Sequence, residues 1–287
     1  MTQIKTKLPT PLGRLVRFWR NTFNLSQEEL ALELESSTRH ISRLENGRVH
    51  PSQEVVLKIA SYLNLKKRDT ANLLIAGGYI PKPQKVAFHS DEYRWLRKVM
   101  AINLEALDPF PAMFTNGAKD IVMVNKSWLG LFNNELEMGN QLFLSDFFSV
   151  IIDKIALRSS DLQRINLIAG LLLTLKQEAL MYDETSFDDL VNNSVEKYSL
   201  PSNWAEIAAK NEPTMSFPIG FEVGGKLQDF FHISNSVTSM GPATGVMESA
   251  FVMIKLFPRD LTLDLSHLAN HEMDHPLLYK HHINQQR

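Results

Sequence analysis

The sequence predicts an all-α domain at the N-terminus followed by a larger α+β domain. The chain has 287 residues, 44% of them apolar, and this length suits two domains that each bury a core of their own. Short segments with helical spacing fill the first part, whereas strand-like and helical segments both occur later. We expect a helical domain at 1–80, a linker and connecting helix at 81–107, the α+β domain at 108–262 and a polar tail at 263–287.

Charge divides the chain near the same place. Residues 1–85 hold 14 Lys and Arg against 7 Asp and Glu, a net charge of +7, whereas the remainder carries −9. A basic module joined to an acidic one is typical of a polyanion-binding module attached to a module of another kind. Chance clustering of surface charge is the alternative interpretation of the charge alone.

Composition excludes several classes of protein. There is no Cys, so disulfides, Cys-ligated zinc, iron–sulfur clusters and thiol catalysis are ruled out, and a reducing, cytoplasmic setting is expected. The longest apolar stretch, Ile165 to Leu175, is interrupted by Asn166, Gly170 and Thr174 and falls short of the ~18 apolar residues of a membrane span. We therefore expect no membrane crossing.

The first two helices are predicted from apolar spacing and from a cap. One apolar face lies between Gly13 and a stop at Asn24, and its residues recur three and four apart: Leu12, Leu15, Val16, Trp19 and Phe23. Ser26, with Glu29 three residues later, forms a capping box. This pair predicts the start of a short second helix.

Three more short helices are predicted in the N-terminal domain. Ser36 or Ser37 is the expected N-cap of the third, and Asn46-Gly47 ends it as a left-handed stop. Pro51-Ser52 starts the fourth helix, and Arg68 to Ala76 forms the fifth. The domain is therefore predicted as a series of five short helices.

Three stretches of this domain, Leu25 to Ala31, Ser37 to Arg48 and Pro51-Ser52, together resemble the helix-turn-helix of lambda-type repressors, the XRE family. The resemblance implies a lambda-repressor-like fold and a DNA-binding transcription regulator. The turn of the family usually carries Gly then Val, whereas Glu35 and Ser36 stand there in this chain. A non-Gly residue is therefore expected to take a positive φ in the turn.

Base contacts are expected from the third helix. In such a motif this helix lies in the major groove, and its first side chains reach base edges. Arg39 is the predicted base reader because its planar fork can bond guanine O6 and N7 together. Thr38 and Arg43 share its outer face, and the resemblance also places Ser37 at the groove. A homodimer on double-stranded DNA is expected, because such units usually read two half-sites one helical turn apart.

The resemblance assigns two further roles in the N-terminal domain. Gln27, Asn46 and Arg48 match family positions that hold phosphates, and such contacts set register without reading sequence. Arg20 and Glu45 match a family pair that joins the first helix to the end of the third. We therefore expect Arg20 and Glu45 to form an internal salt bridge rather than to contact DNA.

The rest of the chain is predicted as a connecting helix, a strand pair, a helical middle and three closing strands. Helical spacing covers Asp91–Leu107, Ser127–Phe132, Leu144–Leu157, Asp161–Tyr182, Ser186–Tyr198 and Asn203–Ala209. The expected strands are Pro111–Phe114, Asp120–Asn125, Thr214–Val223, Lys226–Val237 and Ser249–Phe257, with turns at Asn116-Gly117 and Gly224-Gly225. This order is compatible with a PAS-like sheet that holds its helices on one side.

Short motifs in this part are similar to the MmyB-like regulator ligand-binding family. They are Asp108 to Ala112, Val122 to Asn125, and Leu256 to Asp260 after the last strand. The resemblance implies a PAS-like domain that senses a small molecule. Together with the N-terminal motif, it covers nearly the whole chain.

The interior candidates of this domain are apolar and indicate a long apolar ligand such as a fatty acid or acyl compound. The predicted lining residues are Met123, Phe132, Phe143, Phe147, Leu171, Leu172, Phe217, Phe231 and Met253. Arg164, His232 and Asn125 are the candidates for binding a carboxylate head group. The alternative is that the same side chains form a filled core, in which case the protein is a constitutive dimeric regulator without a ligand.

The C-terminal segment offers a different class of function. His271 to His275 reads His-Glu-Met-Asp-His, the H-E-x-x-H pattern of zinc metalloproteases. That chemistry needs both His on one stable helix and a third ligand, yet Pro276 follows at once. We therefore expect no catalysis, no metal and no cofactor, and we interpret the segment as part of a polar tail.

Overall fold

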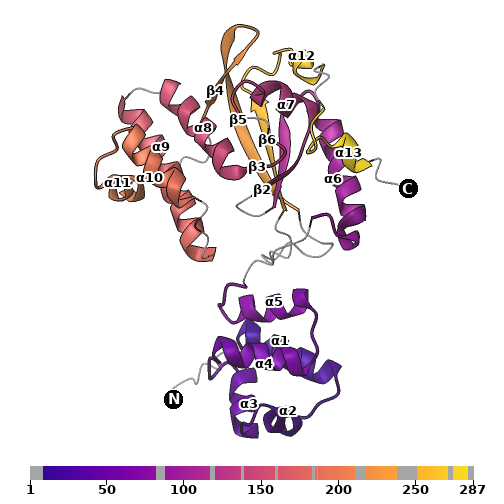
Figure 1. Cartoon of the computed structure of the whole chain (residues 1–287). Coiled ribbons are helices and arrows are strands. Elements are labelled where there is room, and N and C mark those ends of the chain that lie inside the picture. The colour runs from indigo at the N-terminus through magenta and orange to yellow at the C-terminus, as the bar shows by residue number, and fades with distance from the viewer. Residues whose placement is uncertain are drawn as a thin grey trace. The chain divides into compact units, whose positions relative to one another are not determined.

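The computed structural model describes most of the chain (Figure 1): residues 9–81, 88–116, 120–136, 139–158, 161–182, 185, 187–210, 217–237, 251–270 and 274–283. These residues form two compact units. We call the described residues up to 81 the N-terminal unit and those from 88 onward the C-terminal unit.

The described part of the N-terminal unit consists of five short helices, as the spacing predicts. They are α1 (Pro11–Thr22), α2 (Gln27–Glu33), α3 (Thr38–Glu45), α4 (Gln53–Tyr62) and α5 (Lys67–Ala76). Side-chain oxygens of Thr10, Ser26, Ser37 and Ser52 accept hydrogen bonds from main-chain N–H groups at the starts of the first four helices. The core takes apolar side chains from every helix: Leu12, Val16, Leu30, Ile41, Leu44, Val56, Ile59 and Leu73.

Two positions in this unit shape the turn before α3 and the approach of α1 to the end of α3. Glu35, in the turn between α2 and α3, has φ 49°, which confirms the expected positive φ at a non-Gly residue. The Ser36 N–H donates to the Ala31 carbonyl at 2.8 Å and closes this turn. Gly13 lies where α1 crosses the end of α3, because a Cβ there would stand 2.5 Å from the Glu45 carbonyl oxygen. Glycine therefore lets these two helices approach closely.

The C-terminal unit is built on one antiparallel sheet. Its described strands are β1 (Ala112–Asn116), β2 (Asp120–Val124), β3 (Leu142–Phe143), β4 (Ile219–Val223), β5 (Lys226–Ser236) and β6 (Phe251–Pro258). Their spatial order is β3-β2-β1-β6-β5-β4, so the first hairpin lies beside the last strand. Gly224 and Gly225, with φ 59° and 72°, form the turn between β4 and β5.

The described helices of this unit are η1 (Asp91–Tyr93), α6 (Arg94–Leu107), α7 (Lys126–Phe132), α8 (Leu144–Arg158), α9 (Asp161–Tyr182), α10 (Asp188–Lys197), α11 (Trp204–Lys210), α12 (Ser266–Ala269) and α13 (Lys280–Ile283). They follow the predicted order of a connecting helix, a helical middle and a C-terminal segment. No helix among the described residues is long and apolar enough to cross a membrane.

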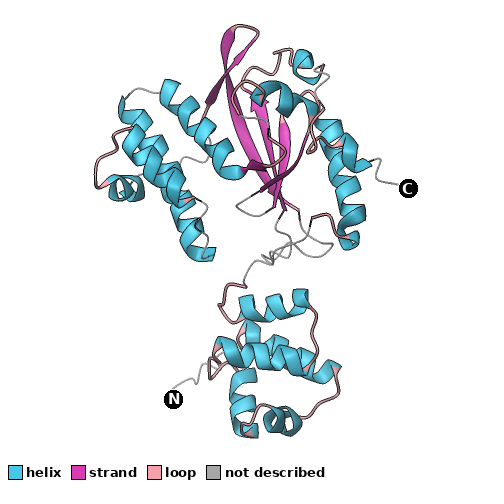
Figure 2. Ribbon diagram, in the orientation of Figure 1, coloured by secondary structure: helices cyan, strands magenta, loops and turns pink. Residues whose placement is uncertain are grey.

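Helical segments lie on both sides of the sheet (Figure 2), so the expectation of helices on one side is wrong. The Phe251 ring of β6 packs against Phe88 and Tyr93, which precede α6, with ring centroids 5.5 and 6.1 Å away. The Phe221 ring of β4 packs against Phe132 of α7 at 5.3 Å. The strand register places Phe251 and Phe221 on opposite faces of the sheet.

The C-terminal segment is not a free polar tail. Leu278 pairs with Val124 at the end of β2 as a parallel bridge. The Val124 N–H donates to the Leu277 carbonyl at 2.8 Å, and the Tyr279 N–H donates to the Val124 carbonyl at 3.0 Å. Leu278 and Tyr279 are buried. The polar tail expected at 263–287 is therefore wrong for the described residues 274–283, because apolar side chains there complete the core.

Candidate nucleic-acid interface

The second and third helices each begin at a side-chain cap. The Ser26 N–H donates to the Glu29 carboxylate at 2.6 Å, and the Ser26 hydroxyl accepts from the Glu29 N–H at 3.1 Å. Hydrogen bonding from Ser26 to the Glu29 carboxylate, chiefly from the Ser26 main-chain N–H, lowers the pKa of the Glu29 carboxyl. Ser37 caps α3 by accepting from the His40 N–H at 3.2 Å. The caps fix where each helix begins, and therefore which residues occupy the first turn of α3.

Helix α3 turns one face to the core and the other to solvent. Ile41 and Leu44 are buried, whereas Thr38, Arg39 and Arg43 are exposed. Arg43 lies one helical turn after Arg39, so the two side chains share the outer face. Among the described residues neither guanidinium has an ion-pair or hydrogen-bond partner. Ser37 is also exposed at the start of this face.

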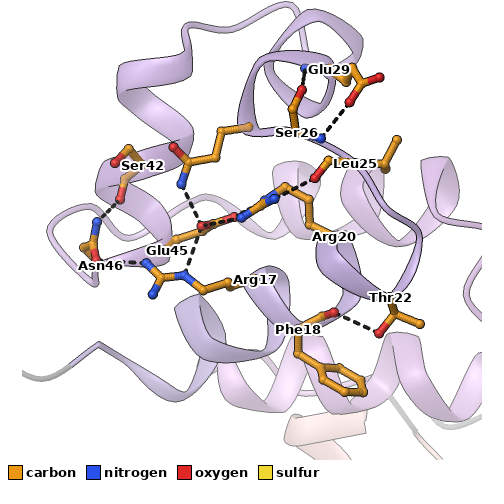
Figure 3. A network of polar contacts seen from close by, with 11 residues as sticks. Arg17, Phe18, Arg20, Thr22, Leu25, Ser26, Glu29, Ser42, Glu45 and Asn46 are labelled. Atoms are coloured by element: carbon orange, nitrogen blue, oxygen red, sulfur yellow. Dashed lines mark hydrogen bonds and ion pairs between the residues drawn. The ribbon is translucent and has the colours of Figure 1, made fainter.

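The other end of α3 is held by a buried carboxylate (Figure 3). The Glu45 side chain has no exposed surface. Arg20 of α1 donates to it through Nε at 2.6 Å and through Nη2 at 3.2 Å, so the expected salt bridge between them is present. Arg17 donates through Nε at 3.2 Å, and Gln27 of α2 donates through Nε2 at 2.8 Å. Arg20 also donates to the Leu25 carbonyl at 2.6 Å. We call these contacts the Glu45 network; they join α1, α2 and the end of α3.

Glu45 stays ionised although it is buried. Burial by itself raises the pKa of this carboxyl, but the hydrogen bonds from Arg20, Gln27 and Arg17, together with the charge of Arg20, outweigh that effect. The pKa of Glu45 therefore lies below its ordinary value of 4.5. At neutral pH a full negative charge orients each donor of the network.

Two helices joined by a tight turn, with the second helix presenting exposed cations, are the arrangement expected of a DNA-binding motif. Residues 16–69 match the helix-turn-helix family. The match runs from within α1 to the start of α5, and it supports an XRE-type DNA-binding transcription regulator. A comparison with curated proteins gives no match.

The expected phosphate-contact residues of the helix-turn-helix differ in how far their polar groups are already engaged in hydrogen bonds within the protein. Asn46 Nδ2 donates to a main-chain carbonyl of α3 at 2.7 Å, and its Oδ1 accepts from Arg17 at 3.0 Å. Gln27 is half-buried, and one of its amide hydrogens is given to the Glu45 network. Arg48 is exposed and has no ion-pair partner among the described residues. Asn46 is therefore held within the helix-turn-helix, whereas Arg48 keeps its charge free.

Sequence reasoning missed Arg17. It contacts both Glu45 and Asn46, and 43% of its side chain is exposed. Arg17 stands three residues before Arg20 and so lies on the same face of α1, which is the signal that could have found it. Its exposed part adds a further cation beside the end of α3.

The expected ligand-binding residues of the C-terminal unit do not form one group. Cross-strand pairing places Met123 and Met253 on the same face of the sheet, and Phe231 shares that face. His232 follows Phe231 on β5 and so points to the opposite face, where Phe132 of α7 lies. The prediction that these residues line one cavity is therefore wrong, because successive residues of a strand point to opposite faces.

Burial separates the apolar candidates further. Met123, Phe132, Phe147, Leu172 and Met253 are buried, Leu171, Phe217 and Phe231 are half-buried, and Phe143 is 36% exposed. Phe143 stands on the short edge strand β3, so its predicted place in an interior cavity is also wrong. The side chain of Arg164 lies outside the described residues.

The remaining polar candidates have different environments. Asn125 is buried: its Oδ1 accepts from the Trp128 N–H at 3.0 Å and from the Ala112 N–H at 2.9 Å, and its Nδ2 donates to the Phe110 carbonyl at 2.8 Å. The ligand contact expected of Asn125 is therefore wrong, because its amide holds the main chain. His232 differs, since its Nδ1 is buried and has no hydrogen-bond partner among the described residues. Burial lowers the pKa of His232, which keeps the ring neutral at neutral pH.

The H-E-x-x-H segment lies partly outside the described residues, which omit 271–273. His275 is described, and its Nε2 lies 2.8 Å from the Gly139 carbonyl oxygen while its Nδ1 accepts from the Leu277 N–H at 3.2 Å. Both ring nitrogens are therefore engaged in the fold. In the described part of the chain, no group of three or more His, Cys, Asp or Glu side chains could hold a metal ion.

Proposed function

We propose that this protein is a sequence-specific transcription regulator that binds double-stranded DNA as a homodimer, with α3 as the recognition helix. Thr38 and Arg39 supply base contacts from the first turn of α3, and Arg43 extends them one turn further. The observation that carries the proposal is the exposed guanidinium of Arg39, which no described residue pairs with, on a helix whose other end is held by the Glu45 network.

The fixed orientation of α3 is what makes base reading selective. Successive residues of a helix are about 100° apart around its axis, so rotation of α3 by one position would move Arg39 off the groove. Glu45 prevents that rotation because Arg20, Arg17 and Gln27 contact it from α1 and α2. With α3 held in this orientation, Arg39 stays on the groove-facing side, from which its planar fork can meet O6 and N7 of one guanine.

Positive charge supports the same function. Residues 1–85 carry a net charge of +7, and exposed Arg48 adds a phosphate contact just beyond α3. Ser37 at the start of α3 and the Gln27 amide hydrogen that is not donated to Glu45 lie on the same motif. In this proposal both add polar contacts to the DNA backbone. Phosphate neutralisation provides sequence-independent affinity and makes binding depend on salt.

Base reading by Arg39 is tested with DNA selected from a random-sequence pool by the full chain. We expect Arg39→Ala to weaken binding to the selected site by about 10-fold to 100-fold, the loss typical of one bidentate base contact. Lys58→Ala is the matched control. Lys58 lies on α4 with 61% of its side chain exposed, and its replacement removes one positive charge, as Arg39→Ala does. An equal loss in both variants would show that Arg39 acts only through charge.

Arg48 separates the phosphate role from the base role. Its replacement by Ala is expected to weaken binding about equally for the selected site and for unrelated DNA, and to lower the salt slope of the affinity by about one. Fluorescence anisotropy over a series of salt concentrations measures both quantities. A loss confined to the selected site would make Arg48 a base reader instead.

We also propose that the C-terminal unit binds a small apolar ligand, such as a fatty acid or acyl compound, on the sheet face covered by α7 and α8. The strand pair, helical middle and three-stranded end support a PAS-like fold with this function. Phe132, Phe147 and Phe221 gather on this face, and His232 brings to it a buried Nδ1 that has no partner in the described part of the chain. A neutral imidazole that donates from this nitrogen suits a carboxylate or carbonyl oxygen.

Ligand binding is tested by native mass spectrometry of the full chain before and after lipid extraction, followed by thermal unfolding with palmitate. We expect an adduct that extraction removes, and a melting temperature of the extracted protein that rises with palmitate concentration. His232→Leu is expected to weaken palmitate binding more than binding of 1-hexadecanol, which lacks the carboxylate. The constitutive regulator with a filled core predicts neither an adduct nor a shift.

A further inference from the structure

Helix α6 is apolar on two opposite sides. Its inner side is buried in the C-terminal unit and carries the apolar residues Met100, Ala101 and Leu104, together with Arg97, whose guanidinium donates to the Phe88 and Ser90 carbonyls. On the outer side Trp95, Val99 and Ile102 are 75%, 52% and 57% exposed, and Ala106 is exposed as well. The four outer residues are spaced by four, three and four positions, the spacing of the a and d residues in a coiled coil. We call Trp95, Val99, Ile102 and Ala106 the outer seam.

We propose that the outer seam pairs with the outer seam of a second copy of this chain, with the two α6 helices antiparallel. In such a pair Val99 of each copy lies opposite the partner's Ile102, and Trp95 lies opposite the partner's Ala106. The largest side chain of the seam therefore meets the smallest, and two branched residues of similar size meet in the middle. A two-fold axis repeats each contact, as a closed homodimer requires.

Two charged residues favour the antiparallel orientation. Lys98 and Glu105 lie seven positions apart on the same flank of the seam, and the Lys98 Nζ lies 4.9 Å from the centre of the Trp95 ring. A two-fold axis across antiparallel helices brings this flank against itself in reverse order, so that Lys98 faces the partner's Glu105 twice. In a parallel pair, the flank that carries Lys98 and Glu105 would instead face the opposite flank of the partner helix. That flank carries Asn103, which has no charge to pair with. Charged residues beside a seam set helix orientation in this way.

The size of the seam predicts a reversible dimer. Its exposed apolar surface is on the order of 300–400 Å² per copy, about half of the ~800 Å² that each partner of a stable complex buries. We therefore expect a dissociation constant in the micromolar range for the free protein. Two adjacent half-sites on DNA would tighten the pair by raising the effective concentration, a step that rests on the proposed function.

Sedimentation of the full chain, from about 1 to about 100 µM, tests the pairing. We expect a monomer–dimer equilibrium that Lys98→Glu or Glu105→Lys alone weakens about tenfold, because each change sets like charges opposite one another twice. The double variant Lys98→Glu/Glu105→Lys is expected to restore the parent equilibrium, since it exchanges the charges but keeps them complementary. Val99→Glu should abolish the dimer, whereas the control Leu157→Glu, at a 77% exposed position of α8, should not.

Folding of the variants is checked by circular dichroism. Lys98→Glu should keep α6 helical, because it places an acidic residue four positions after Arg94, where opposite charges stabilise a helix. A parent that is monomeric at every concentration overturns the inference, and this includes a monomer whose own N-terminal unit covers the seam. A dimer that neither Val99→Glu nor the charge reversals affect overturns it too. Failure of the proposed function is distinguishable, because Arg39→Ala would then bind DNA like the parent whatever the state of the dimer.

Discussion

Arg20 Nε lies 2.6 Å from Glu45 Oε1, and this contact joins the first helix of the helix-turn-helix unit to the last residue of the third. Only 12% of the Arg20 side chain is exposed and none of the Glu45 side chain. The pair is therefore largely removed from water. Deletion of one partner of such a buried ion pair is strongly destabilising, because it leaves the other charge buried without compensation. Because α3 carries the proposed base contacts, stability of this unit and DNA affinity depend on the same two residues.

Removal of Arg20 should destabilise the N-terminal unit. Arg20→Ala leaves a buried carboxylate whose remaining donors among the described residues are Arg17 and Gln27, and we expect the free energy of unfolding to fall by about 3 kcal/mol. Urea unfolding followed by circular dichroism measures the loss, with Lys58→Ala as a control that should change it by less than about 0.5 kcal/mol. Loss of DNA affinity at unchanged stability would instead make Arg20 a DNA contact.

Acid should destabilise the same unit through Glu45. Its pKa is lowered in the folded protein, so the stability it contributes is fully present above the ordinary value of 4.5 and is lost as pH falls through the folded value. We expect the melting temperature of the N-terminal unit to fall below about pH 4.5 more steeply in the parent than in Glu45→Gln. The variant should be less stable at pH 7, because a neutral amide cannot replace the charge. Parallel pH profiles for the two proteins would contradict this role.

Close packing of α1 on α3 should make Gly13 intolerant of a side chain. A Cβ at Gly13 would lie 2.5 Å from the Glu45 carbonyl oxygen and 2.7 Å from that of Leu44, so Gly13→Ala is expected to cost about 2 kcal/mol or more. Gly170 in α9 is the matched control, because no atom of the described residues outside its own helix backbone stands within 4 Å of its added Cβ. Gly170→Ala should stabilise the protein by about 0.5–1 kcal/mol. Thermal unfolding measures the direction of the stability change in both variants. A Gly13→Ala variant that is more stable than the parent would contradict the close approach of α1 to α3.

Asn125 should be a stability residue of the C-terminal unit. Its amide holds Ala112, Trp128 and Phe110 while fully buried, so Asn125→Ala is expected to lower the free energy of unfolding by about 2–4 kcal/mol. Asn133→Ala, at an exposed position after α7, should change it by less than about 0.5 kcal/mol. Normal stability with lost palmitate binding would return Asn125 to the ligand-contact residues.

Much of the N-terminal unit could be predicted from sequence because its signals are local. Ser26 and Ser37 bond to main-chain groups three residues away, and Glu35 takes its left-handed conformation within a turn that closes over six residues. Such features depend on a few neighbouring residues. Only the resemblance to a known family suggested the longer contact between Arg20 and Glu45.

Contacts between distant segments could not be predicted in the same way. Gln27 is 18 residues from Glu45, and its bond depends on how α2 packs beside the end of α3. The alternation along β5 that separates Phe231 from His232 is readable, but which face each helix covers depends on tertiary packing. The bridge of Leu278 to Val124 was missed because a short apolar run near the end of a chain has no local signal for its partner.

The most direct test of the proposed function is a footprint of the full chain on the DNA that it selects. Thr38, Arg39 and Arg43 are all exposed, so replacing the three with Ala should leave the helical content and the unfolding free energy nearly unchanged. We predict that this triple variant no longer protects the selected bases at concentrations where the parent and Lys58→Ala both do. Protection of the same bases by the triple variant at the same concentration would contradict base reading by α3.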